Sequence, residues 1–460
     1  MKKRVVAAVL AGVMAAGLAG CGAAAGTAAE TAASHEDAAV SEEQGTEEAE
    51  SETGADAAQE PVSISFYTTE TGKDDMFQDL IRDFQEKNPG ITVEYIAAGD
   101  DQLQKWMSLY ASNEGPTVSL MDPINIYENR ERMKDLTDKE LIANIQEDAL
   151  STFTFDGRIY GAPYTAAGIG ILYNQAVCDE AVGGTFDPAS IKTRSDLEDL
   201  FNKIEATGRA GTMFTGVNWS LGAHYVGITY GAANGDVEAR VQKVADLKAG
   251  QLSLADDEVI NDYFDTFDMM AEHNYNKEDP LVGNINMDAQ AFADGAAGTW
   301  FMGDWAWTYL GPIVEEGAEF GLLPVPLNDD PDNEVNTLLP TSFAKGYCVD
   351  ASQNSKAQQA AGVKFIQYIT SDEYAEEQLA KIAGQALPYK NFNGEIESPL
   401  GRSTASYISA GRNYDFYGTP DLLPSDFWYE NGAYMCEYIS GACDRQTLFS
   451  DMEAYWKNIQ

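Results

Sequence analysis

The chain has 460 residues, enough for about two to four folding units of ordinary size. Its 74 acidic residues against 29 lysines and arginines give a formal net charge of −45, which argues against nucleic-acid binding because phosphate contacts need clustered basic side chains. Three histidines and five cysteines exclude a zinc-finger array and a dense disulfide scaffold.

The first twenty residues have the pattern of a secretory signal. A basic start, residues 2–4, precedes an apolar run over residues 5–20 that is too short and too rich in alanine and glycine to span a bilayer well. The run ends in Leu-Ala-Gly-Cys at residues 18–21, which resembles the bacterial lipobox. That resemblance implies cleavage after Gly20 and lipidation of Cys21; the alternative is an ordinary signal peptide with a chance cysteine.

Residues 21–60 are expected to be a lipidated cysteine followed by a disordered acidic tether. Residues 22–60 contain 13 alanines, 11 carboxylates and no lysine or arginine. A segment with so few large apolar side chains and so much charge cannot bury a core. We interpret it as a spacer, and the plainer alternative is solubilising disorder.

The body opens as an α/β protein. Apolar residues alternate over 62–66, repeat at helical spacing over 76–84 and alternate again over 91–95, which predicts a β-α-β unit and a parallel sheet. A third strand is expected at 117–121, and Ser195 with Glu198 has the spacing of a capping box. Because open parallel sheets bind ligands beyond the carboxyl ends of their strands, the loops 67–72, 97–102 and 122–127 are candidate ligand loops.

Motifs for catalysis or for a bound cofactor are missing from the sequence. It contains no phosphate-binding loop, zinc-protease motif or serine-hydrolase elbow, so we expect neither a cofactor nor catalytic residues. His224 and His273 stand alone and are interpreted as ordinary histidines. The run Asn-Asp-Asp-Pro-Asp-Asn-Glu at 328–334 is a possible calcium loop but more typical of a solvated acidic loop. Whether Cys436 and Cys443 form a disulfide stays open, because a shared helix would hold them too far apart.

Aromatic residues in polar, glycine-broken segments give the positive signal. Three clusters contain tryptophans, at 217–220, 301–307 and 426–430. A flat indole beside carboxylates or amides suits a sugar, because the C–H face of the ring packs on the indole and the hydroxyls bond to the polar neighbours. Any single tryptophan could equally be core filling.

The order and spacing of several motifs make the body resemble the family 1 extracellular solute-binding proteins of bacterial ABC importers. The segments that carry the resemblance are Asn-Pro-Gly-Ile-Thr-Val-Glu at 88–94, Asp-Gly-Arg-Ile-Tyr-Gly-Ala-Pro at 156–163, Ile-Leu-Tyr-Asn at 171–174, Phe-Ala-Asp-Gly at 292–295, Gly-Asp-Trp at 303–305 and Phe-Gly-Leu-Leu-Pro-Val-Pro at 320–326. The resemblance implies an α/β, two-lobed periplasmic-binding-protein type II fold with a hinge between the lobes. Lobe 1 is then expected at 61–168 plus 325–375, and lobe 2 at 169–324 plus 376–460.

The resemblance also assigns candidate ligand-binding residues. Trp305 matches a sugar-stacking position of maltose-binding members of the family, and Asp304 beside it is expected to accept sugar hydroxyls. Trp428 corresponds to a second stacking position near the C-terminus, and Trp219 is added from its place in lobe 2. Expected strand-end geometry adds three more candidates: Glu70, Asp122 and Tyr164.

The resulting hypothesis is a lipid-anchored, monomeric receptor on the extracellular face of the cell membrane, or on the periplasmic face in a two-membrane bacterium. It would capture a neutral mono- or oligosaccharide between its lobes, make and break no bond, and deliver the sugar to ABC transporter permease subunits. Two alternatives stay open: the same fold binding a polyamine or another cation, as the negative charge suggests, and a secreted carbohydrate-active enzyme that uses a carboxylate pair.

Overall fold

The computed structural model describes residues 60–459 except 100–101, 232–236 and 417–421. The chain divides into two compact units, and the described residues all belong to the second, Gln59–Gln460. The expected signal peptide, Cys21 and nearly all of the tether lie outside the described residues. Within the described ranges, no helix is both long and apolar enough to cross a bilayer.

The first main sheet begins with the β-α-β unit that the sequence predicts. Strands β1, β2 and β3 are parallel, and β11 inserts antiparallel between β3 and β6. The strand order and bounds are β2 (Ile91–Ala97), β1 (Val62–Thr68), β3 (Val118–Met121), β11 (Gly346–Val349) and β6 (Ala162–Pro163).

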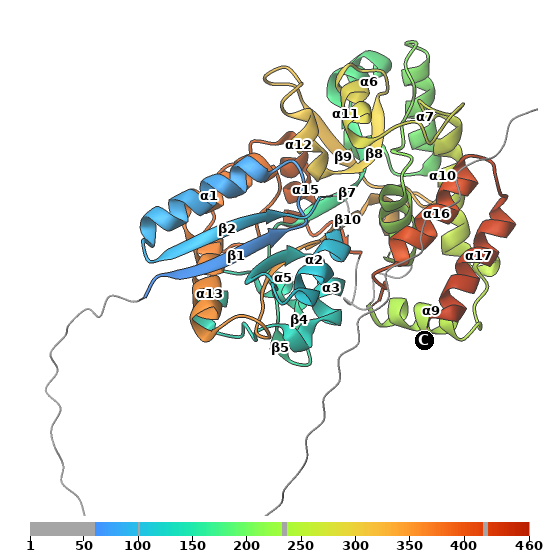
Figure 1. The fold of residues 1–460 in the computed structure, drawn as a ribbon. Helices are drawn as coiled ribbons and strands as arrows, with labels where there is room; N and C mark the ends of the chain where they lie inside the picture. Colours follow the sequence, from blue (N-terminus) through green and yellow to red (C-terminus); the bar gives the residue numbers. More distant parts are fainter. Residues whose placement is uncertain (1–59, 100–101, 232–236, 417–421, 460) are drawn as a thin grey trace, which may run out of the picture. The chain divides into compact units, whose positions relative to one another are not determined.

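Helices cover both faces of this sheet because side chains of β1 alternate between the faces. On one face Phe66 packs edge-on against Phe77 and Phe365, at 5.3 and 5.4 Å between ring centres. On the other face Tyr67 lies in a cluster with Trp106. The helices of this lobe include α1 (Asp74–Lys87), α2 (Gln102–Ala111), α3 (Pro123–Glu128), α5 (Glu147–Ser151), α13 (Lys356–Ser371) and α14 (Glu373–Gln378) (Figure 1).

The second main sheet is built around β7, which is buried along its whole length. Strand β7 pairs antiparallel with β10, β8 and β9, and β10 pairs parallel with β12. The bounds are β7 (Ala167–Asn174), β8 (Thr299–Gly303), β9 (Phe320–Leu323), β10 (Leu339–Ser342) and β12 (Asn413–Asp415).

Two apolar cores lie against the second sheet, because successive side chains of β7 point to opposite sides. Ile169 and Ile171 belong to one core, and Leu172 belongs to the other. The larger core is formed with α6 (Gln175–Val182), α7 (Arg194–Glu205), the π-helix η3 (Trp219–Val226), α10 (Glu258–Glu272), α16 (Phe427–Ile439) and α17 (Arg445–Asn458). The smaller core uses α11 (Ile285–Ala293), α12 (Trp307–Leu310) and α15 (Pro399–Ser409).

Helix α9 and several shorter elements complete the described part of the chain. They are η1 (Arg130–Arg132), α4 (Lys139–Ile142), β4 (Thr154–Phe155), β5 (Arg158–Ile159), η2 (Pro188–Ser190), α8 (Gly227–Gly231), α9 (Val237–Lys248), η4 (Leu254–Asp256), η5 (Asp304–Ala306), η6 (Glu334–Thr337) and η7 (Leu379–Ala383). Helix α7 begins two residues earlier than the expected capping box, because Thr193 rather than Ser195 accepts the hydrogen bond that caps it.

Three segments of chain connect the two sheets, and they pair with one another where they cross. Ala166 bridges to Ala386, and Ala167 pairs with Ser342. The crossings therefore lie between β6 and β7, between β10 and β11, and along the segment from Gln385 to Leu400. That third segment leaves the first core at Tyr389 and enters the second core at Leu400.

The second and third predicted lobe boundaries, at 324/325 and 375/376, differ from these crossings. The segment carrying β10 stays in the second lobe because β10 pairs with β7 and β12. Residues 376–389 stay in the first lobe, where Leu379 and Leu387 pack in its core. The first predicted boundary, after residue 168, falls after the second residue of strand β7, just past the crossing.

Candidate ligand-binding site

Two of the predicted tryptophans meet on the second lobe, with a histidine between them. Trp219 begins the π-helix η3, and Trp305 lies in the short helix η5, two residues after the end of strand β8. The ring centre of His224 lies 5.6 Å from that of Trp219 and 4.7 Å from that of Trp305. All three residues are partly exposed. We call Trp219, His224 and Trp305 the aromatic group.

Gly303 makes room for the indole of Trp305. A Cβ on Gly303 would lie 2.0 Å from Cζ3 of the Trp305 ring, far inside contact distance. The indole therefore folds back over the end of β8 only because this position has no side chain. The expected sugar-stacking residue is thus held in place by the glycine of its own Gly-Asp-Trp motif.

Trp428 lies beside the same segment because two backbones approach each other closely. A Cβ on Gly222 of η3 would lie 2.5 Å from the carbonyl oxygen of Trp428, and one on Gly432 would lie 2.3 Å from the carbonyl oxygen of Asn218. Trp428 is partly exposed and stacks on Tyr429, with 3.5 Å between ring centres. The three predicted tryptophans are therefore carried by η3, α16 and η5, the short helix that follows β8.

Charged residues gather on the first lobe, at the carboxyl ends of β1 and β3. Lys345 Nζ donates to Asp122 Oδ1 at 3.0 Å and to Thr69 Oγ1 at 2.8 Å, and it lies 3.9 Å from Glu70 Oε1. Lys73 Nζ forms an ion pair with Glu70 Oε2 at 2.6 Å. We call Glu70, Lys73, Asp122 and Lys345 the charged group.

The charged group is balanced, with two ammonium and two carboxylate groups. Burial alone would raise the pKa of Glu70, but the ammonium groups of Lys73 and Lys345 outweigh it and lower that pKa. Burial alone would lower the pKa of Lys345, and its carboxylate partners raise it instead. Each shift favours the charged form of its group, so the Glu70 carboxylate and the Lys345 ammonium stabilise each other's charge.

Tyr164 lies beneath the charged group instead of at its surface. It is almost fully buried, and Lys73 Nζ lies 5.4 Å above the centre of its ring. Its hydroxyl is buried and has no hydrogen-bond partner among the described residues. Burial raises the pKa of Tyr164 well above its usual value, so the hydroxyl stays protonated.

Asp304 departs from its expected role of accepting ligand hydroxyls. It is completely buried, and its carboxylate accepts hydrogen bonds from the Gly168 amide at 3.0 Å, Thr404 Oγ1 at 2.8 Å and Gln385 Nε2 at 2.7 Å. Burial raises the pKa of Asp304 to about 6. In this conformation both oxygens are used inside the protein, where they tie the start of β7 to α15 and to the third crossing segment.

Further contacts between described residues join the lobes near these groups. Thr71 Oγ1 lies 3.2 Å from the hydroxyl of Tyr309, and Ser425 Oγ donates to Glu128 Oε1 at 3.0 Å. Thr71 follows Glu70, and Tyr309 lies one helical turn after Trp305. The charged group of the first lobe and the aromatic group of the second therefore border the same junction between the lobes.

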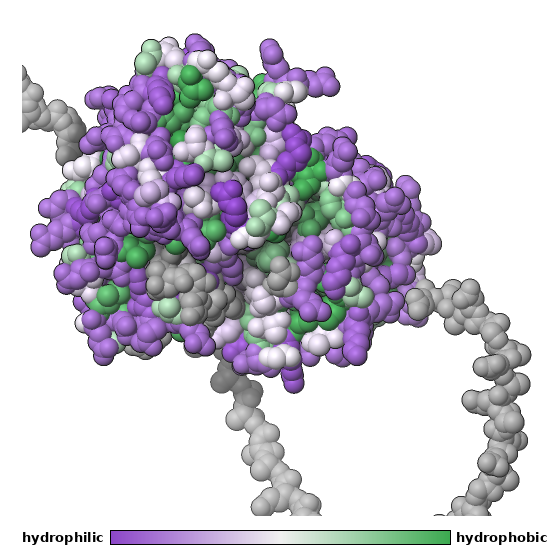
Figure 2. Space-filling view, turned by 180° about the vertical axis from the view of Figure 1, so that it is seen from behind, coloured by the Kyte–Doolittle hydropathy of each residue, from purple (hydrophilic) through white to green (hydrophobic). Residues whose placement is uncertain are grey.

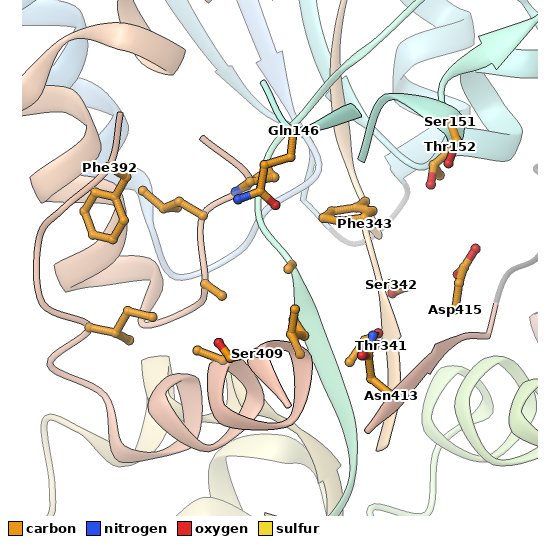
Figure 3. Close-up of a pocket in the computed structure, with 17 residues that line it drawn as sticks. Gln146, Ser151, Thr152, Thr341, Ser342, Phe343, Phe392, Ser409, Asn413 and Asp415 are labelled. Atoms are coloured by element: carbon orange, nitrogen blue, oxygen red, sulfur yellow. The ribbon is translucent and has the colours of Figure 1, made fainter. Parts of the chain in front are cut away.

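A cavity of about 360 Å³ lies where the three crossing segments meet (Figure 3). It is lined by Ala166, by 341–343 and by 386–388, together with parts of α5, α15 and β12. None of the predicted site residues lines it. In the space-filling view, hydrophilic residues dominate the outer parts of the visible face, and paler or hydrophobic residues gather toward its middle (Figure 2).

The acidic loop at 328–334 and the cysteine pair 436 and 443 both lie among the described residues. The loop at 328–334 is held by Asn336, whose amide donates to the carbonyl oxygens of Asn328 and Asp330. The described residues contain no cluster of three or more histidine, cysteine or acidic side chains arranged to hold a metal. Cys436 and Cys443 are both free thiols.

Sequence reasoning missed three residues of these groups: Lys73, His224 and Lys345. Lys73 follows Glu70 by three residues and comes directly after the predicted ligand loop 67–72, and this spacing was an available signal. Lys345 comes from far along the chain, and only the insertion of β11 beside β3 brings it to the site. His224 had no sequence signal, because it reaches the tryptophans through a π-helix.

Two α/β lobes, three crossing segments and polar and aromatic groups at their junction define a two-lobed binding protein of the periplasmic type II fold. The chain belongs to the bacterial extracellular solute-binding protein family, whose model matches residues 79–390. The predicted resemblance to extracellular solute-binding proteins and the predicted two-lobed fold are both confirmed. A comparison with curated protein sequences finds no match.

Solved structures with the same fold include sugar-binding proteins. The raffinose complex of the binding protein RafE has a TM-score of 0.71 at 18% identity, covering 86% of this chain and 99% of that one. A chitin oligosaccharide binding protein has a TM-score of 0.68 at 21% identity, with 86% and 98% covered. A Bacillus licheniformis sugar transporter protein in complex with stachyose has a TM-score of 0.68 at 17% identity, with 87% and 100% covered.

Proposed function

We propose that the chain is the substrate-binding lipoprotein of an ABC importer and that it captures a neutral mono- or oligosaccharide between its lobes. Trp219, Trp305 and Trp428 would stack on sugar rings from the second lobe. Glu70, Asp122 and Lys345 would bind hydroxyls from the first lobe. Asp304 and Tyr164 would position these residues without touching the ligand.

The observation that carries this proposal is the pairing of partly exposed indoles on one lobe with a balanced charged group on the other. Paired donors and acceptors suit hydroxyl groups, each of which donates and accepts. Because its two carboxylates are paired with two ammonium groups, the charged group offers no excess negative charge to a polyamine. The sugars named for the structures of similar fold favour the same ligand class.

The cellular part of the proposal follows from the leader and the family. Lipidation at Cys21 would anchor the protein to the outer face of the cell membrane, and the acidic tether would hold its folded body away from the anionic surface. The captured sugar would pass unaltered to the permease subunits, from a monomeric receptor. A cation-binding member of the fold and a carbohydrate-active enzyme are the competing functions.

Tryptophan fluorescence titration of the purified chain tests the proposal. The panel contains raffinose, stachyose, maltose, chitobiose and spermidine. We expect at least one sugar to bind with a micromolar Kd, about −8 kcal/mol, and spermidine not to bind. Saturable binding of spermidine alone would favour the cation reading, and release of reducing ends from a bound oligosaccharide would favour the enzyme.

Paired variants locate the site. Trp305→Ala should weaken sugar binding by at least tenfold, because a stacking indole and its burial are lost. Tyr374→Ala is the matched control, since Tyr374 is an exposed aromatic on the first lobe that contacts Lys87 at the far end of α1. Equal affinities of the two variants would remove Trp305 from the site.

A further inference from the structure

His224 occupies a position that an α-helix would not give it. Residues 219–226 form a π-helix, in which the hydrogen-bonded turn links residue i to i+5. In an α-helix a residue five places later is rotated by about 140° from the first. The wider turn instead brings His224 into edge-on contact with Trp219, and from there it also reaches Trp305.

The imidazole has contacts with rings but lacks a hydrogen bond at Nδ1. This nitrogen is buried and has no partner among the described residues. Leaving a buried polar atom unpaired is unfavourable in a folded protein, so each such atom in a native structure needs an explanation. Solvent does not reach Nδ1 here, and Trp219 and Trp305 cannot accept a hydrogen bond from it through their indole nitrogens.

Burial also fixes the chemical form of the ring. Desolvation lowers the pKa of His224 to about 3, so the imidazole is neutral at physiological pH. A neutral imidazole has one N–H donor and one nitrogen acceptor. It therefore matches a hydroxyl group, which also donates and accepts, and it adds no charge to the aromatic group.

We propose that His224 is a specificity-determining residue of the ligand site: a ring nitrogen of His224 hydrogen-bonds a ligand hydroxyl between the indoles of Trp219 and Trp305. This inference rests on the proposed function. The two indoles stack on the faces of the sugar rings whatever the hydroxyl pattern. The imidazole between them selects for one hydroxyl by hydrogen bonding to it. When ligand enters, the indoles shift enough to admit that hydroxyl, and the unpaired nitrogen gains its partner.

This role predicts opposite effects on stability and on binding. Replacing His224 with phenylalanine keeps a flat ring among the tryptophans and removes both nitrogens. The ligand-free variant should melt at the same temperature as the wild type or higher, because the unpaired buried atom is gone. Its affinity for the sugar should fall by about tenfold, the loss expected for one hydrogen bond whose partner stays buried.

Amide variants identify the nitrogen. His224→Asn places a polar atom near the position of Nδ1, and His224→Gln places one near Nε2. Titration of wild type and the three variants with raffinose, stachyose, maltose and chitobiose, followed by tryptophan fluorescence, gives the affinities, and thermal melting without sugar gives the stabilities. Restoration of affinity to within about threefold of wild type by either amide supports the proposal.

Each other outcome overturns it. The inference fails if His224→Phe binds as tightly as the wild type. It also fails if neither amide restores binding, since ring shape then matters and not hydrogen bonding. If His224→Phe lowers the ligand-free melting temperature, the imidazole is a structural group. These three results leave sugar binding itself intact, whereas a wild type that binds none of the four sugars refutes the proposed function together with this inference.

Discussion

The buried carboxyl group of Asp304 should make the stability of the fold depend on pH. Its carboxylate is completely buried, accepts three hydrogen bonds and has a pKa raised to about 6. The ordinary value is 3.8, so the folded state holds this proton over a pH range in which the unfolded chain has lost it. Between pH 4 and pH 6 the folded state therefore binds more protons, and its stability falls as pH rises.

The size of the effect follows from the shift. A change of about two pKa units corresponds to roughly 3 kcal/mol of stability lost between pH 4 and pH 7, at about 1.4 kcal/mol per unit. Asp304→Asn carries no titrating group, so it lacks this part of the pH dependence. The free energies of unfolding of the variant and the wild type therefore differ by two contributions. The rearranged hydrogen bonds of the variant give a constant difference, and the missing titration gives a difference that increasingly favours the variant as pH rises.

Urea unfolding of both proteins at half-unit steps from pH 4 to pH 7.5 measures the difference. The other acidic residues are shared, so their contributions cancel. Asp288→Asn is a matched comparison, because burial also raises the pKa of Asp288 to about 6, and it should show the same trend. A difference between Asp304→Asn and wild type that stays constant across the range would refute the reasoning.

Three further predictions concern the two groups and the contacts between lobes. Gly303→Ala should displace the Trp305 indole, shift the tryptophan emission, weaken sugar binding at least tenfold and lower the unfolding free energy by about 1–3 kcal/mol; an unchanged spectrum and affinity would contradict it. Lys345→Met should lower the unfolding free energy by about 1–2 kcal/mol in urea, because its partly buried carboxylate partners lose their counter-charge, and an unchanged midpoint would count against the charged group. Tyr309→Phe should remove a contact between lobes worth about 1 kcal/mol, so small-angle scattering should show a larger ligand-free radius and titration about fivefold weaker sugar binding. Identical scattering curves would contradict the last prediction.

Local sequence patterns were sufficient where neighbours in the chain decide the structure. The alternation over 62–66 became β1, the apolar spacing over 76–84 became α1, and the strand expected at 117–121 became β3. These elements bury their apolar faces against one another, so pattern and packing agree. The start of α7 was less well predicted, because Thr193 and Ser195 are both good caps and only the surrounding structure selects one.

Strand pairing over long distances was beyond the sequence. Nothing local to β10 shows that it pairs with β7 and β12, so the second lobe boundary was placed too early. The third boundary had the same difficulty, because residues 376–389 are held in the first lobe by core contacts from distant segments. The lobe to which a segment belongs is determined by the distant strands and core residues that it contacts, and its own sequence does not reveal them.

The candidate site likewise has features that a local motif predicts and features that depend on distant segments. The Gly-Asp-Trp motif located Trp305, because the glycine and the indole are in contact with each other. Burial of Asp304, its neighbour, could not be read from the motif, since its partners Gly168, Gln385 and Thr404 lie on three other segments. A hydrogen-bond network of this kind exists only after the crossings have formed.

The position of β11 late in the sequence determines when the first sheet can finish folding. Strands β3 and β6 have no direct pairing with each other, and Gly346–Val349 fills the place between them. Until that stretch has been synthesised, both strands present unpaired backbone edges that invite association with other chains. Closing so long a loop is entropically slow, and a fragment that stops before Gly346 should therefore aggregate and not fold into a working half.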